Sequence, residues 1–246
     1  MKHDTPVLAI VASNLFALAL ALWHGWAPNL LLVPIWIQSV VIGYYAYRRI
    51  LAMGRFTTAG VRVVGTVEGA TDSIRREGAG SFAALYGTAH LVYAFFLLLF
   101  ALPHEISSAE PGLLAMLEPA TRSDLVGFLA GGVAFFLAHR HSHRAHLERD
   151  LAGPPDLGLA MLLPTVRIVP MHLTILLGFL FGDRLSAIAF LMALKTGADV
   201  LMHVLEHRWL RLGDRAPAYL LHVGRVNFTV QGRLDEGGVP AAPGSA

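Results

Sequence analysis

Long apolar segments alternate with short polar stretches along the chain. Six of these segments are long enough to cross about 30 Å of hydrocarbon as helices. The pattern predicts an all-α fold, a polytopic membrane bundle of six transmembrane helices forming one domain over residues 1–231. Residues 232–246 are rich in Gly, Pro and Ala and are predicted to be disordered. The six predicted spans are residues 6–23, 30–47, 81–102, 125–138, 166–182 and 185–210.

The stretches outside these spans complete the predicted layout. The first span follows a short n-region and has no Ala-x-Ala-like site before His24, so we interpret it as an anchor and not as a cleaved signal peptide. The connection over residues 50–80 is basic and has an amphipathic pattern from Phe56 to Val67, so we expect it to lie on the membrane surface. A Gly-Pro-Pro turn at 153–155 separates the fourth and fifth spans.

Composition supports a membrane protein. Hydrophobic residues make up 55% of the 246 residues and charged residues only 15%, whereas a soluble domain usually carries about 25% charged residues. The chain has no cysteine, which excludes disulfides, iron–sulfur clusters, thiolate zinc sites and cysteine nucleophiles.

The positions of Lys and Arg predict the orientation. We assume that the N-terminus is cytoplasmic and that the six spans alternate in direction. Of the Lys and Arg residues in the loops and at the span ends, only Arg122 and Arg184 then face outward. The positive-inside rule therefore places both termini in the cytoplasm, and we expect a prokaryotic cytoplasmic (inner) membrane. The inward-facing residues are Lys2, Arg48, Arg49, Arg55, Arg62, Arg75, Arg76, Arg140, Arg144, Arg149, Arg208, Arg211, Arg215, Arg225 and Arg233.

The last span ends in a stripe of polar residues between Lys195 and His207. At about 100° per residue, Asp199, His203 and His207 share one face of a helix, with Glu206 on its flank. Polar residues inside a membrane span are candidates for a functional site.

Three histidines from other spans reach the same half of the bilayer in this topology. They are His90 in the third span, His139 at the end of the fourth and His172 in the fifth. Imidazoles with a carboxylate and no sulfur suit transition metals, so we expect zinc first and iron second. The predicted metal ligands are His90, His139, His172, Asp199, His203 and His207. Of the nearby His141, His143 and His146, none is predicted to reach the metal.

Three further residues are candidate catalytic groups. His203-Val-Leu-Glu206-His207 matches the H-x-x-E-H pattern, in which the glutamate acts as base. Arg167 is either an interfacial anchor or a binding group for an anionic headgroup or substrate. Lys195 either forms an ion pair with Asp199 four residues later or supports a metal ligand.

Simpler interpretations remain open for the histidines. His203 and His207 could be interfacial residues with their polar tips in water. A lone His90 or His172 is often hydrogen-bonded to a neighbouring helix, and facing histidines such as this pair could also ligate haem. No phosphate-binding loop, dinucleotide fingerprint, nucleophile elbow or nucleic-acid module is present.

Four blocks of the sequence resemble an uncharacterised prokaryotic membrane family, the domain-of-unknown-function family six-four-nine-eight. The resemblance covers about residues 6–210 and implies a six-helix fold with the six predicted ligands as a His/Asp site, but no established activity. This chain has Gln38 and Ser39 where the family usually has Glu and Asn, so a role for that carboxylate does not carry over. The blocks are Trp36-Ile-Gln-Ser-Val-Val-Ile-Gly-Tyr-Tyr, Tyr86-Gly-Thr-Ala-His90, Arg167-Ile-Val-Pro-Met-His172-Leu and Lys195-Thr-Gly-Ala-Asp199-Val-Leu-Met-His203-Val-Leu-Glu-His207.

Two functional hypotheses follow. The first is a membrane metalloenzyme with one or two metal ions, a hydrolase or else a di-metal oxygenase, acting on a lipid-like or membrane-soluble substrate. The second is a metal or proton transporter, or a haem-binding or structural membrane subunit. A transport relay needs polar groups through the full membrane thickness, whereas the outer halves of these spans are almost wholly apolar. The expected partners are membrane lipids and not nucleic acid.

Overall fold

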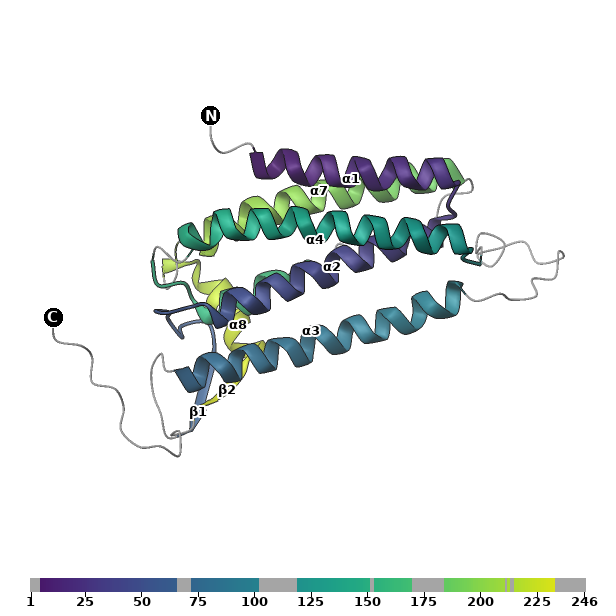
Figure 1. Cartoon of the computed structure of the whole chain (residues 1–246). Coiled ribbons are helices and arrows are strands. Elements are labelled where there is room, and N and C mark those ends of the chain that lie inside the picture. Colours follow the sequence, from purple (N-terminus) through teal and green to yellow (C-terminus); the bar gives the residue numbers. More distant parts are fainter. Residues whose placement is uncertain are drawn as a thin grey trace.

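Five long helices lie side by side and form a bundle, with a small cap at one end (Figure 1). The computed structural model describes residues 5–65, 72–101, 119–150, 153–169, 184–210, 212 and 215–232. Helices dominate these residues, which confirms the predicted all-α class. The bundle consists of α1 (Thr5–His24), α2 (Pro28–Leu51), α3 (Asp72–Ala101), α4 (Arg122–Asp150) and α7 (Arg184–Leu210). The cap consists of α5 (Leu157–Val166), α8 (Ala218–Asn227), β1 (Arg62–Gly65) and β2 (Thr229–Gly232).

Helix α2 is the centre of the bundle. It packs against α3, α4, α5 and α7, whereas α1 packs against α4 and α7. The sequence explains this position, because apolar residues occur on several faces of α2 and are buried along most of its length. Pro28 begins the helix, where the missing backbone N–H costs nothing.

The end of the bundle opposite the cap is closed by an apolar cluster around Trp26. Its ring packs against Phe128, and its Nε1 donates a hydrogen bond of 2.7 Å to Asp124 Oδ1 at the start of α4. Gly127 allows this approach, since a Cβ there would lie 2.8 Å from the Trp26 ring. Leu31, Phe135 and Leu191 extend the same cluster along the bundle axis. We call this end the Trp26 end.

Three helices in the described part of the chain are long and apolar enough to cross a membrane. They are Pro28–Leu51, Asp72–Leu99 and Leu185–Glu206, which coincide with the second, third and sixth predicted spans. The first predicted span forms α1, whose apolar part Ile10–His24 is shorter, and the fourth lies within α4. Most of the fifth span, including His172, lies outside the described residues.

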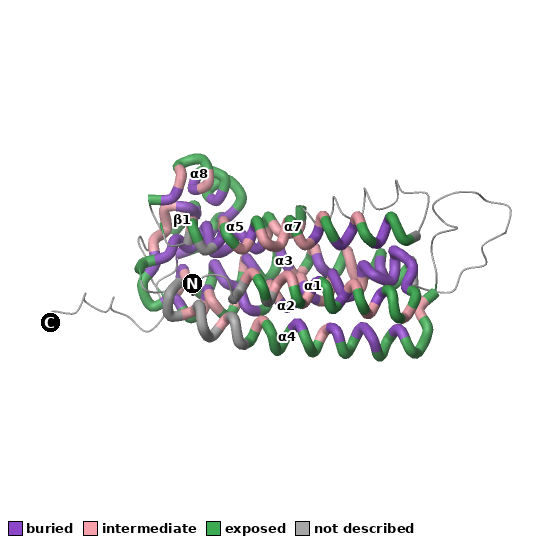
Figure 2. The backbone as a smooth tube through the Cα atoms, turned by 90° about the horizontal axis from the view of Figure 1, so that it is seen from above, coloured by how far each residue is buried: buried purple, intermediate pink, exposed green. Residues whose placement is uncertain are grey.

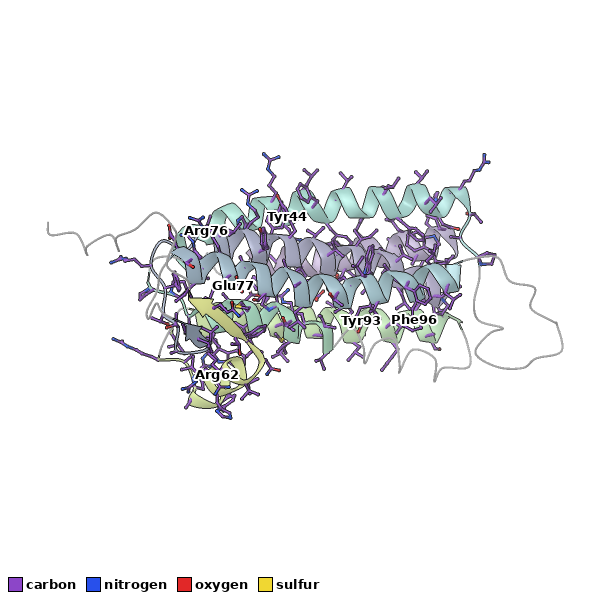
Figure 3. The ribbon with its side chains drawn as sticks, turned by 90° about the horizontal axis from the view of Figure 1, so that it is seen from below. Tyr44, Arg62, Arg76, Glu77, Tyr93 and Phe96 are labelled. Atoms are coloured by element: carbon purple, nitrogen blue, oxygen red, sulfur yellow. The ribbon has the colours of Figure 1, made fainter. Side chains whose placement is uncertain are left out.

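Large apolar side chains are exposed along the outside of the bundle. They include Leu91 and Phe95 on α3 and Val126 and Leu129 on α4, and exposed positions recur along both helices (Figure 2). On α3 the charged Arg76 and Glu77 lie near the cap, whereas Tyr93 and Phe96 lie farther toward the Trp26 end (Figure 3). An exposed apolar belt with charges near its end is the surface that a lipid environment favours.

The cap differs from the sequence-based prediction. Within the connection predicted as an amphipathic surface stretch, Arg62–Gly65 forms β1, which pairs in parallel with β2 (Thr229–Gly232). Helix α5 precedes the predicted fifth span, and its residues Leu157–Pro164 are all buried. The predicted start of the third span, Ser81, lies inside α3, which begins at Asp72. Two four-residue strands and a ten-residue apolar helix are too short for periodicity alone to identify.

Asp156 holds the cap together. Its completely buried carboxylate accepts hydrogen bonds from Thr57 Oγ1 (2.9 Å), Gly60 N (3.0 Å) and Leu159 N (3.1 Å). The bond from Leu159 caps the N-terminus of α5. Burial raises the pKa of the Asp156 carboxyl, and the hydrogen bonds oppose that rise. Gly158 packs so closely on Gly60 that a Cβ there would overlap the Gly60 carbonyl.

Replacing Asp156 with Ala should lower the free energy of unfolding by about 2–4 kcal/mol, because the α5 cap is lost and buried donors lose their acceptor. Thermal and denaturant unfolding of the purified protein in detergent measures this change. Asp72→Ala is the matched control, since the Asp72 side chain is 63% exposed and pairs only at the surface with Arg75. Equal stabilities of the two variants would contradict the assigned role of Asp156.

Candidate functional site

The buried polar side chains of the described helices begin near the middle of the bundle and continue toward the cap. Asn14, Gln38, His90 and Lys195 each lie about ten residues from the helix end near Trp26, which is about 15 Å along a helix. Buried polar residues on the other side of this level, Asn29 and Asp124, are close to helix ends. The described interior is therefore apolar near the Trp26 end, apart from groups close to helix ends, and contains buried polar groups from the middle of the bundle to the cap.

Lys195 and Asp199 form a buried ion pair on α7. The Lys195 ammonium donates to Asp199 Oδ2 and also to Asn14 Oδ1 at 3.3 Å. Asn14 Nδ2 donates in turn to Asp199 Oδ2 at 3.0 Å. The ion pair proposed as one alternative from the sequence is therefore present, and it joins α7 to α1.

Glu206 binds two arginines from different elements. Its Oε1 accepts from Arg49 at 2.5 Å, and its Oε2 accepts from Arg167 at 2.7 Å. All three side chains are at most 14% exposed, so the contact joins α7, α2 and the end of α5 inside the protein. A carboxylate held by two guanidinium groups is a poor proton acceptor, and the role of Glu206 as a catalytic base stays a prediction.

His90 belongs to a hydrogen-bonded group between α2 and α3. Its Nδ1 donates to the Tyr86 carbonyl (2.8 Å), and its Nε2 contacts Ser39 Oγ (2.9 Å). Tyr86 stacks on the imidazole and donates to the Ser39 carbonyl, while Trp36 Nε1 donates to the His90 carbonyl. Both ring nitrogens therefore have partners within this helix pair, as expected of a histidine bonded to a neighbouring helix.

His139 lies near the charged residues of α7. Its Nδ1 donates to the Phe135 carbonyl at 3.0 Å, and its ring lies 6.4 Å from that of Tyr45. It is within electrostatic range of Arg167, Asp199 and Lys195, so the structure brings these four predicted residues into one neighbourhood. His143, one helical turn farther on, packs against Tyr45.

The remaining predicted ligands are only partly described. His203 is half-buried on α7, and the side chains of His207, His141 and His146 lie outside the described part of the chain, as does the whole of His172. Among the described residues, no three His, Asp or Glu side chains are grouped as metal ligands. The predicted histidine-rich metal centre is thus not visible in these residues, and His90 is held in a separate hydrogen-bonded group.

Three residues that bind the predicted site residues were not identified from the sequence. Asn14 is a single amide in an otherwise apolar span, Arg49 was interpreted only as an orientation signal, and Ser39 was noted only for its position in a motif. Polarity within an apolar run was the available signal for Asn14. No sequence signal separates Arg49, which pairs inside the protein, from the exposed Arg48 beside it.

Replacing Lys195 with Met should lower the free energy of unfolding by about 3–5 kcal/mol, because Asp199 would be left as an unpaired buried charge. The double change Lys195→Met with Asp199→Leu should restore most of that loss, since both charges are then absent. Thermal unfolding of the single and double variants in detergent measures the coupling. Additive losses would show that the two residues act independently.

Comparison with known proteins supports the family resemblance and adds no activity. No curated protein and no solved structure matches the chain. A family model matches residues 1–215, which include all five bundle helices and α5. The chain therefore belongs to a family of unknown function, DUF6498.

Proposed function

We propose that this chain is an integral membrane protein with six transmembrane helices, both termini in the cytoplasm and the cap on the cytoplasmic face of a prokaryotic inner membrane. Three candidate spans and the exposed apolar surface of the bundle support a membrane location. The cap end carries Arg48, Arg55 and Arg62, whereas Arg122 and Arg184 begin helices at the Trp26 end. This distribution supports the orientation.

Within this protein we propose a metal-dependent site near the cap, formed by His139, Asp199 and His203 with His172 and His207. The observation that carries the proposal is the orientation of His139, which is within electrostatic range of Asp199. Its Nδ1–H donates to a backbone carbonyl, which leaves the Nε2 lone pair for a ligand. Metal-binding histidines are commonly oriented by such a bond. His90 has the same Nδ1 bond but belongs to the α2–α3 group.

The proposed activity is hydrolysis, or oxygen chemistry as the second choice, on a lipid-like or membrane-soluble substrate. A bound zinc or iron ion would supply Lewis-acid chemistry, or redox chemistry in the case of iron. Asp199 would provide a carboxylate ligand. Lys195 would then still donate to Asn14 Oδ1 if its contact with Asp199 were lost. The apolar cluster around Trp26 would keep water from entering through that end of the bundle.

A structural membrane subunit is the second candidate. Glu206 joins α7 to α2 and to the end of α5 through ion pairs, and Asp199 joins α7 to α1 through its hydrogen bond with Asn14. These contacts favour a structural role, because the charged groups bind one another and need no ligand. A transporter fits less well, since the described interior between the middle of the bundle and the Trp26 end contains buried polar groups only close to helix ends.

Metal analysis of the detergent-purified protein should find a transition metal at close to stoichiometric amounts, because three or more protein ligands would hold the ion through purification. His139→Ala and His203→Ala should each lower the metal content strongly. His222→Ala is the control, since His222 is exposed on α8. Inductively coupled plasma mass spectrometry gives the result, and a protein without metal when expressed in metal-rich medium would sink the metalloprotein proposal.

The topology is tested with single cysteines, which the native chain lacks. Arg122→Cys should react with a membrane-impermeant maleimide in intact spheroplasts, because it faces outward in the proposed orientation. Arg55→Cys, also exposed, should react only after the membrane is permeabilised. Labelling in the reverse order would contradict the proposed orientation.

A further inference from the structure

We infer that the buried guanidinium of Arg167 binds the anionic headgroup, a phosphate or carboxylate, of a membrane-soluble ligand. The inference rests on the proposed function only in taking this ligand to be the substrate. It names the chemical class of that substrate and the residue that recognises it.

The buried ion pairs around Arg167 contain more cations than carboxylates. Three cations, Arg49, Arg167 and Lys195, face two carboxylates, Asp199 and Glu206, so these five residues carry one net positive charge when the histidines are neutral. They form one electrostatic group, because Arg167 interacts with Asp199 as well as with Glu206. Counted over these five residues, an excess of positive charge away from water is costly, and an anionic ligand would reduce that cost.

The Arg167 guanidinium is buried and only partly hydrogen-bonded among the described residues. Its side chain is 11% exposed, and Nη2 donates to Glu206 Oε2 at 2.7 Å. Its Nε is buried, and among the described residues no acceptor lies within hydrogen-bonding distance of it. Guanidinium groups bind phosphate and carboxylate through two parallel N–H donors, so a free buried Nε–H is suited to an anion.

The segment that directly follows Arg167 has no acidic residue before Asp183. Residues 168–182 contain neither Asp nor Glu. The segment that follows Arg167 therefore cannot provide the missing negative charge. Arg167 caps the C-terminus of α5, which belongs to the cap, and contacts α7 of the bundle, so the anion would bind where these two parts meet.

The position also suits a substrate. Arg167 is within electrostatic range of His139 and of Asp199, two of the proposed metal ligands. A headgroup held at Arg167 would bring its reacting bond to the proposed metal while its acyl chain remains in the apolar surroundings of the bundle. Glu206 occupies the same guanidinium and acts as an internal competitor of the anion.

The test measures lipid binding by the full-length protein in detergent, by native mass spectrometry and by thermal shift. The probes are dioleoyl phosphatidate and oleate, with dioleoyl phosphatidylcholine as the zwitterionic comparison and inorganic phosphate as the soluble one. We expect both anionic lipids to bind and to raise the unfolding temperature more than phosphatidylcholine does. Competition by inorganic phosphate at similar concentration would identify a soluble anion as the ligand, whereas no competition identifies a lipid headgroup.

Three variants separate recognition from structural effects. Arg167→Gln should weaken phosphatidate binding about tenfold or more, because a charge-assisted bond is lost. Glu206→Gln should strengthen it by removing the competitor. Arg48→Gln should leave it unchanged, since Arg48 is exposed and its guanidinium donates to Tyr44 on the bundle surface. Equal weakening by Arg167→Gln and Glu206→Gln would overturn the inference. If Arg167→Gln does not fold, Arg167→Lys replaces it; lysine lacks the second parallel donor, and unchanged affinity would then overturn the inference.

Metal content is measured on the same variants. Arg167→Gln with normal metal content and weakened phosphatidate binding supports both proposals. A wild-type protein that contains no metal but binds phosphatidate through Arg167 supports the anion site and removes the metal-dependent function. Equal binding of phosphatidate and phosphatidylcholine overturns the anion site whatever the metal content is.

Discussion

The arrangement of this protein depends on charges placed where water is scarce. Glu206 binds Arg49 and Arg167 at 2.5 and 2.7 Å, and in doing so joins three elements that are distant in sequence. Charges buried in apolar surroundings are tolerated only with close partners, so this contact restricts how α7 can lie against α2 and the cap. The Lys195–Asp199 pair with Asn14 imposes a similar restriction between α7 and α1. Helix α7 is thereby fixed by polar contacts on two sides.

Those contacts also divide the interior into two environments. Near Trp26 the helices meet through apolar side chains, and close packing determines their spacing. Near the cap the same helices meet through polar groups whose directions matter as well as their sizes. A binding or catalytic site benefits from the second environment, because groups already held by hydrogen bonds need little reorganisation when a ligand arrives. Arg167 lies where this polar interior meets the cap, because it ends α5 of the cap and binds Glu206 on α7.

Much of the bundle could be predicted from the sequence, because long apolar runs and the 3.6-residue period are strong signals. The predicted helices over residues 6–23, 30–47 and 185–210 lie within α1, α2 and α7. The α7 stripe and the Lys195–Asp199 pair were also predictable, since both depend on spacing within one helix. The cap was not, because β1 pairs with a strand that is more than 160 residues away and each strand has four residues.

The site was predictable only where one helix defines it. Depth along the bundle predicted His139 at the level of Asp199, and the two are within electrostatic range, but depth does not say which side of α2 a residue occupies. His90 reaches a similar level and lies instead in the α2–α3 interface, bonded to Ser39. The partners of Glu206 come from two other elements, and such pairings across elements have no signature in local sequence.

The pairing of β1 with β2 also sets an order of events during synthesis. β1 leaves the ribosome early, after α2, whereas β2 is the last described element of the chain. The edge of β1 must therefore wait for its partner while α3, α4, α5, α7 and α8 are made, and bringing two such distant segments together carries a loop-closure entropy cost. The β1–β2 pair of the cap can therefore form only after all the described helices have been made.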